Sequence, residues 1–100
     1  MENLKKNIIT EYLKQHKNEF MNKYAIKKIG LFGSFATENN NDNSDIDIVY
    51  ETTTKDLTLK QYFQIEEELK QQFNRNIDLV NIKYMNPLIK RKAQKDIIYV

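Results

Sequence analysis

Apolar residues recur at helical spacing near the start of the chain. Leu4, Ile8, Tyr12 and other large apolar residues fall three or four positions apart between residues 2 and 20, and lysine, glutamine and glutamate fill the positions between them. This spacing predicts an amphipathic helix over residues 2–20 that packs one face on the rest of the fold. His16 lies near the apolar stripe, and we interpret it as a boundary residue rather than a metal ligand.

Three later segments have the pattern of β-strands. Residues 27–32 are mostly apolar and end at Gly33-Ser34, residues 45–50 alternate acidic and aliphatic side chains, and residues 76–82 read NIDLVNI. Short apolar or alternating runs of this length predict strands. The asparagine-rich residues 39–43 predict a loop between the first two strands, and a short turn of helix can follow Gly33-Ser34.

Helical spacing returns in residues 58–73, where one side carries Leu59, Tyr62, Phe63, Leu69 and Phe73. Asn86 then predicts an N-cap and Pro87 the first position of a last helix that runs to about residue 96. Residues 97–100 predict a short closing strand or a tail. The order of elements predicts a single α+β domain over residues 1–100, with a small mixed sheet and helices packed on it in two layers.

The composition supports this fold and excludes several classes of protein. With 100 residues, 40% hydrophobic and 30% charged, the chain suits one globular core. The absence of cysteine excludes a disulfide framework and a thiolate metal site. We find neither the apolar run of roughly 18–20 residues that a membrane span needs nor the apolar segment of a signal peptide, so we expect a cytoplasmic protein that does not associate with membranes.

A cluster of cations lies near the C-terminus and consists of Lys83, Lys90, Arg91, Lys92 and Lys95. The formal net charge of the whole chain is only +2, which does not by itself indicate a nucleic-acid-binding protein. We interpret the cluster as solvated helix surface or as a docking site for an acidic partner. Direct binding of nucleic acid is not expected.

Two aspartates in an apolar strand are the first candidates for chemistry. Period two places Asp45 and Asp47 on one strand face, about 7 Å apart, where their charges repel unless a cation lies between them. Asp78 repeats the pattern in the third strand, because Ile77 and Leu79 bracket it. If the two strands are neighbours, the three carboxylates converge on one spot, a geometry that suits one or two Mg²⁺ ions with phosphate oxygens as further ligands.

Gly33 and Ser34 add a candidate phosphate site. Gly33 lets the backbone approach a ligand closely, and Ser34 offers a hydroxyl and, if a helical turn follows, free backbone N–H groups. Each signal has a simpler explanation when taken alone, since an Asp-x-Asp pair is common on exposed strands and Gly-Ser is usually a turn. A calcium-binding loop is excluded because the run of asparagine and aspartate lacks the required glycine and late glutamate. Their joint occurrence favours a nucleotidyl-transfer site.

These residues carry a family resemblance that extends over nearly the whole chain. Phe32-Gly33-Ser34, a spacer, and Ser44 followed by Asp45-Ile46-Asp47-Ile48 resemble the signature of minimal nucleotidyltransferases of the DNA polymerase β-like superfamily. Asp78 matches the third carboxylate of that family. Residues 35–38 read FATE, where many members carry arginines.

The resemblance implies the polymerase β-like fold and an Mg²⁺-dependent attack of a hydroxyl on the α-phosphate of ATP. By resemblance, Asp45 and Asp47 hold both metals, and Asp78 binds the catalytic metal and helps to take the proton of the hydroxyl. Ser34 and the backbone at Gly33 contact the outer phosphates, and Ser44 belongs to the nucleotide site.

The acceptor is a separate question. Stand-alone chains of this kind resemble the antitoxin half of HEPN/MNT toxin–antitoxin pairs. The resemblance implies that AMP is moved from ATP to a hydroxyl, most simply that of a tyrosine, on a HEPN ribonuclease toxin that is the partner. Two alternatives stay open: an antitoxin that neutralises its toxin by binding alone, and a nucleotidyltransferase for a small molecule of the aminoglycoside type.

Overall fold

The strand-like segments pair into one four-stranded mixed sheet. The computed structural model describes residues 4–100. The strands are β1 (Ile26–Phe32), β2 (Ile46–Thr52), β3 (Ile77–Asn81) and β4 (Ile98–Tyr99). The helices are α1 (Lys6–Gln15), α2 (Lys17–Tyr24), α3 (Gly33–Ala36), α4 (Leu59–Phe73) and α5 (Pro87–Ala93), with a 3-10 helix, η1, at Ile82–Tyr84. The predicted α+β class and the three predicted strands are confirmed, with strand ends that differ by one or two residues.

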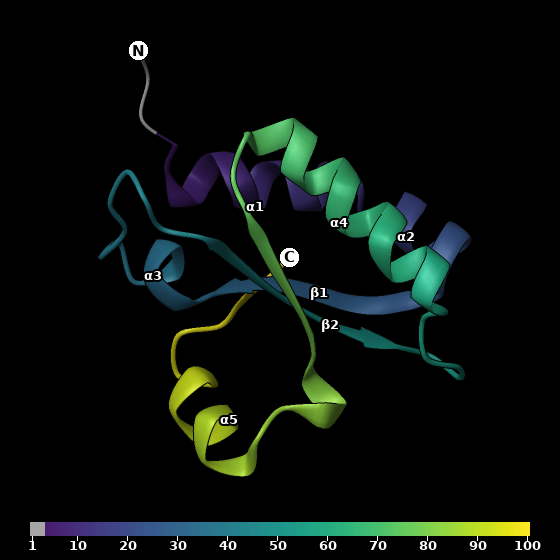
Figure 1. Ribbon diagram of the computed structural model, residues 1–100. Helices are drawn as coiled ribbons and strands as arrows, with labels where there is room; N and C mark the ends of the chain where they lie inside the picture. The colour runs from purple at the N-terminus through teal and green to yellow at the C-terminus, as the bar shows by residue number, and fades with distance from the viewer. Residues whose placement is uncertain (1–3) are drawn as a thin grey trace.

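The sheet order is β3-β2-β1-β4. Strand β1 is antiparallel to both β2 and β4, and β2 is parallel to β3. Helices α1, α2 and α4 cover one face of the sheet, whereas α5 lies on the opposite side (Figure 1). The parallel β2–β3 pair is joined through α4, as a crossover connection between parallel strands requires.

The hydrophobic core fills the space between the sheet and the three helices on its covered face. Ile46 and Ile48 of β2 point into it, together with Leu31 of β1, and all three are fully buried. Each buried aliphatic side chain stabilises the fold by about 1.5–3 kcal/mol. Because side chains alternate along a strand, burial of Ile46 and Ile48 directs Asp47 to the opposite face of the sheet.

The first predicted helix is two helices, which corrects the expectation of a continuous helix over residues 2–20. His16 has φ −100° and ψ 5° and separates α1 from α2. Its Nδ1 lies 2.9 Å from the carbonyl oxygen of Tyr12, and its ring stacks on the Tyr12 ring with centroids 4.0 Å apart. The break lets α2 turn onto β1. His16 is half-buried, as predicted for a residue at the edge of the apolar stripe, but the helix break at this position was not predicted. Residues 2–3 of the predicted helix lie outside the described residues.

Helix α4 begins and ends as predicted, but its buried face is different. Thr58 caps it, since the Thr58 hydroxyl accepts a hydrogen bond from the Gln61 N–H at 3.1 Å and the Gln61 side chain accepts one from the Thr58 N–H at 3.0 Å. Ile65 and Leu69 are buried, whereas Leu59 is 72% and Phe63 54% exposed. Neighbouring residues of a helix point about 100° apart, so Phe63 cannot face the sheet where Tyr62 does.

The C-terminal segment closes the sheet. Asn86 is the N-cap of α5, with its side chain accepting a hydrogen bond from the Leu88 N–H at 2.9 Å, and Pro87 is the first helical residue, as predicted. The helix ends at Ala93, earlier than the predicted residue 96. The predicted closing strand is β4, whose Ile98 and Tyr99 pair with β1. None of the helices in residues 4–100 is long and apolar enough to span a membrane.

Candidate active site

Two of the predicted carboxylates lie side by side on the face of the sheet that α1, α2 and α4 leave uncovered. In the register of the sheet, Asp47 of β2 is opposite Phe32 of β1 on one side and Asp78 of β3 on the other. Aligned residues on neighbouring strands point to the same face. The sheet therefore confirms the expected pairing of Asp47 with Asp78, although the sequence separation between them is large.

Without a bound cation, the charged form of Asp47 is unfavourable in this environment. Burial raises the pKa of Asp47 to about 6, helped by the charge of Asp78, a hydrogen bond with Asp78 and the charge of Asp45. Asp47 is half-buried, whereas Asp45 and Asp78 are exposed. A bound cation would offset the repulsion between the carboxylates, and oxygen ligands are those that hard cations such as Mg²⁺ prefer.

Asp45 lies outside the strand in which it was predicted. β2 begins at Ile46, whose N–H donates to the Asn76 carbonyl oxygen at 2.9 Å, so Asp45 belongs to the end of the preceding loop. Within the described residues 4–100, no three histidine, cysteine, aspartate or glutamate side chains form a ready-made metal site. The arrangement is thus a close pair, Asp47 and Asp78, with Asp45 near enough to act on the pKa of Asp47.

Gly33 lies directly against this pair. Its φ is +73°, a backbone conformation that residues other than glycine rarely adopt. A Cβ atom at this position would lie 2.1 Å from Oδ2 of Asp47 and 2.9 Å from its Cγ. Both the backbone conformation and the close approach therefore require glycine here, and they hold the first turn of α3 beside the carboxylates.

Ser34 and Ser44 take different places. Ser34 is half-buried in the first turn of α3, the short helix that the sequence predicted after Gly33. The N–H groups of a first helical turn have no partner within the helix, and Phe32, the N-cap, supplies no side-chain cap. Ser44 lies in the asparagine-rich loop, where its hydroxyl accepts a hydrogen bond from the Asn41 N–H at 2.8 Å.

Arg75 fixes this loop, and the sequence reasoning did not identify it. Its Nη1 donates to the carbonyl oxygens of Asn41 at 3.1 Å and Ser44 at 2.9 Å, and its guanidinium lies 5.4 Å from the centre of the Phe35 ring in α3. Arg75 thus ties the loop that ends at Asp45 to both α3 and the start of β3. The sequence contains one indication that Arg75 has a specific role: it is one of only two arginines in a chain rich in lysine.

We expect Arg75→Ala to lower the free energy of unfolding by about 1 kcal/mol, since two partly exposed charged hydrogen bonds are lost. Amide hydrogens of residues 41–45 should exchange faster. Urea unfolding and hydrogen exchange measure the two effects. Arg91→Ala removes the other arginine from the exposed side of α5 and serves as the control. Equal effects of the two substitutions would contradict the conclusion that Arg75 fixes the loop of residues 41–45.

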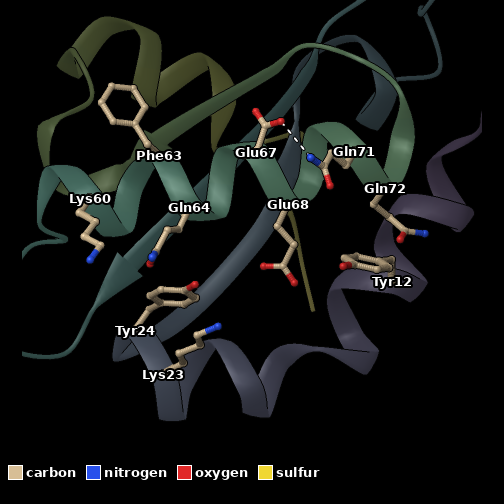
Figure 2. Close-up of a pocket in the computed structure, with 10 residues that line it drawn as sticks. All are labelled: Tyr12, Lys23, Tyr24, Lys60, Phe63, Gln64, Glu67, Glu68, Gln71 and Gln72. Carbon is tan, nitrogen blue, oxygen red and sulfur yellow. Dashed lines mark hydrogen bonds between the residues drawn. The ribbon is translucent and has the colours of Figure 1, made fainter.

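A wide groove lies elsewhere on the molecule. It has a volume of about 940 Å³ and separates α4 from α1 and α2 on the helical face. Figure 2 shows Gln64 and Glu68 of α4 pointing toward Tyr12, Lys23 and Tyr24 on the other wall. None of the predicted site residues lines it. The carboxylate pair is on the opposite side of the sheet from this groove, because Ile46 and Ile48 face the helices and Asp47 points the other way.

Comparison with known proteins identifies relatives of similar length. A protein of Methanocaldococcus jannaschii with a provisional protein adenylyltransferase name is 35% identical over 94 residues, which cover 92% of this chain and 94% of the relative. The protein adenylyltransferase MntA of Thermococcus cleftensis is 27% identical over 92 residues, which cover 92% of each chain.

Solved structures share the fold. A minimal nucleotidyltransferase, also named provisionally, superposes with a TM-score of 0.76 at 14% identity and 98% coverage of both chains. A toxin–antitoxin structure with AMP-PNP gives 0.70 at 22% identity, covering 96% of this chain and 72% of the other. A tri-AMPylated HEPN toxin of Shewanella oneidensis in complex with its MNT antitoxin gives 0.60 at 19% identity, covering 94% and 66%.

The decisive comparison is at the level of the family. The polymerase beta nucleotidyltransferase family matches residues 7–100, a span that contains Gly33, Ser34 and all three aspartates. The fold, the glycine turn and the paired carboxylates agree with that match, and the chain belongs to the polymerase beta nucleotidyltransferase family.

Proposed function

We propose that this chain transfers AMP from ATP, with Mg²⁺, to a tyrosine hydroxyl of a HEPN-type toxin and thereby acts as its antitoxin. The observation that carries the proposal is the Asp47–Asp78 pair with Gly33 packed against it. Relatives named as protein adenylyltransferases support the reaction. Fold neighbours described with AMP-PNP and with an AMPylated HEPN toxin support the donor and the acceptor.

The carboxylates suit a cation by their chemistry. Asp45, Asp47 and Asp78 would hold Mg²⁺, with two ions expected. Burial and then the charge of Asp78 raise the pKa of Asp47, and a bound cation would offset both by favouring the charged carboxylate. When bound, the metal neutralises phosphate charge and polarises the α-phosphate. Gly33 and the first turn of α3 would direct backbone N–H groups to the outer phosphates, and Ser34 would add its hydroxyl. The Ser44 hydroxyl, an acceptor for Asn41, can still donate to the nucleotide.

The transfer step replaces the α–β phosphoanhydride bond of ATP by a phosphoester bond to the acceptor. The oxygen of the acceptor hydroxyl forms a bond to the α-phosphorus, and the bond from that phosphorus to the oxygen bridging the α- and β-phosphates breaks. Pyrophosphate leaves with the electron pair of that bond. The hydroxyl proton passes to Asp78, because this carboxylate is exposed on the side from which an acceptor can approach, whereas Asp47 is half-buried.

Intact mass spectrometry of a HEPN-family protein from the same organism tests the proposal. After incubation with this chain, ATP and Mg²⁺, we expect the HEPN protein to gain one or more AMP units. Asp45→Asn/Asp47→Asn should prevent the gain. A stable complex without added mass, together with toxin neutralisation that survives this double substitution, would instead identify an antitoxin that acts by binding alone.

A further inference from the structure

Helix α5 exposes an apolar pair followed by a run of cations. Leu88 and Ile89 are 74% and 56% exposed, and Lys90, Arg91 and Lys92 follow them directly. None of the seven residues of α5 is buried. Packing therefore adds little stability to α5. A helix of this length is also marginal on its own, because isolated helices shorter than about 12 residues are marginal in water. A partner that covers Leu88 and Ile89 would add the missing burial.

Within the segment that contains α5, residues 82–95, every charged side chain is cationic. Between Ile82 and Lys95 the chain places five of its 16 cationic residues and none of its 14 acidic ones. In residues 4–100 the ion pairs are Lys6–Glu38 and Lys27–Glu51, neither of which involves this segment. These cations are therefore available to an acidic partner, although the whole chain is only slightly basic.

The position of α5 relates it to the candidate active site. Figure 1 shows α5 across the sheet from α1, α2 and α4. Ile46 and Ile48 face those three helices, so Asp47 points toward the side on which α5 lies. An acceptor that brings a hydroxyl to the Asp47–Asp78 pair must approach from this side of the sheet, the side on which α5 lies.

We propose that α5 is the docking surface for the acceptor protein and that it binds an acidic polypeptide segment. Apolar side chains of that segment cover Leu88 and Ile89, and its carboxylates pair with Lys90, Arg91 and Lys92. This inference rests on the proposed function, because it supplies the acceptor of the same reaction. A second copy of the chain fits poorly, since a twofold contact through α5 would bring like charges together. Nucleic acid also fits poorly, since Leu88 and Ile89 offer no flat surface on which bases can stack.

Two tyrosine peptides of equal length and leucine content, one rich in glutamate and the other in lysine, test the docking surface. Their dissociation constants are measured by fluorescence anisotropy without ATP. We expect the wild-type chain to bind the glutamate peptide at least about tenfold more tightly. Lys90→Glu/Arg91→Glu/Lys92→Glu should reverse this preference. Leu88→Ser/Ile89→Ser should weaken binding of the glutamate peptide by about threefold or more.

Control variants separate docking from general electrostatics. Lys14→Glu/Lys17→Glu/Lys60→Glu changes the charge equally at exposed positions on the other helices and should keep the wild-type preference. The neutral variant Lys90→Gln/Arg91→Gln/Lys92→Gln should remove the preference without reversing it. Circular dichroism checks that each variant is folded, which we expect because α5 has no buried residue.

The outcomes are distinct. The inference is wrong if the wild type binds both peptides equally, if the control triple variant loses the preference as well, or if a single-stranded RNA oligonucleotide binds α5 more tightly than the glutamate peptide does. Self-association of the wild type that Leu88→Ser/Ile89→Ser abolishes would also overturn it. Because binding is measured without ATP, a chain that binds as expected but transfers no AMP counts against the proposed function and leaves the docking surface intact.

Discussion

Asp47→Asn is expected to abolish AMP transfer and, at the same time, to stabilise the fold above pH 6. The loss of activity should be at least about 100-fold, because the substitution removes a charged group at the reacting phosphate. The gain in stability follows from the environment of Asp47, where burial and the charge of Asp78 raise its pKa to about 6. Asparagine has the same shape and no charge, so the repulsion with Asp78 disappears.

The sign of the pH effect follows from proton binding. Between the ordinary pKa of about 3.8 and the folded value of about 6, the folded protein holds more protons than the unfolded chain, so the free energy of unfolding of the wild type falls as pH rises through this window. Asp47→Asn lacks this dependence. At pH 7.5 without divalent cation we expect it to be more stable by about 1 kcal/mol, a figure reduced for the half-exposure of the carboxyl group.

Urea unfolding at pH 5 and pH 7.5, with and without Mg²⁺, measures these differences. Mg²⁺ should stabilise the wild type and leave Asp47→Asn almost unchanged, because ligand binding to the folded state alone raises its stability. Asp96→Asn, an exposed aspartate after α5, is the matched control and should behave as the wild type in every assay. A variant that keeps its AMP transfer, or that is less stable than the wild type at pH 7.5, would contradict the role assigned to Asp47.

Gly33→Ala is expected to reduce AMP transfer by about 100-fold and to destabilise the fold by about 1–2 kcal/mol. The energetic cost comes from φ +73°, which alanine adopts poorly. The loss of activity comes from the Cβ atom, which would overlap Oδ2 of Asp47 at 2.1 Å and push the carboxylate away from Asp78. Activity assays with thermal unfolding measure both effects.

Gly30→Ala is the matched control for this prediction. Its Cβ would also overlap a neighbour, the carbonyl oxygen of Ile98 at 2.7 Å, but this contact belongs to β4 and not to the carboxylate pair. We expect a similar loss of stability and a much smaller loss of AMP transfer, assayed well below the unfolding temperature. Equal losses of activity in the two variants would show that stability, and not the geometry at Asp47, explains the effect of Gly33→Ala.

Local patterns predicted most of the secondary structure because they act over a few residues. The alternation around Asp47 predicts β2, and the Asn86-Pro87 pair predicts the start of α5 through an N-cap hydrogen bond within the same turn. The break at His16 was missed for the same reason. Both halves of the pattern are helical, and the separation of α1 from α2 serves the packing of α2 on β1.

By itself the sequence determined which residue types the site contains, since Gly33, Ser34 and the three aspartates stand in a recognisable order along the chain. Only the tertiary structure decided how they meet. The register of β2 against β3 places Asp47 beside Asp78, whereas Asp45 lies in the loop before β2, and no ready-made group of three metal-binding side chains is found in residues 4–100. Arg75 reaches Asn41 and Ser44 across more than 30 positions of sequence. Such contacts depend on which strands are neighbours, a property of core packing that no local pattern encodes.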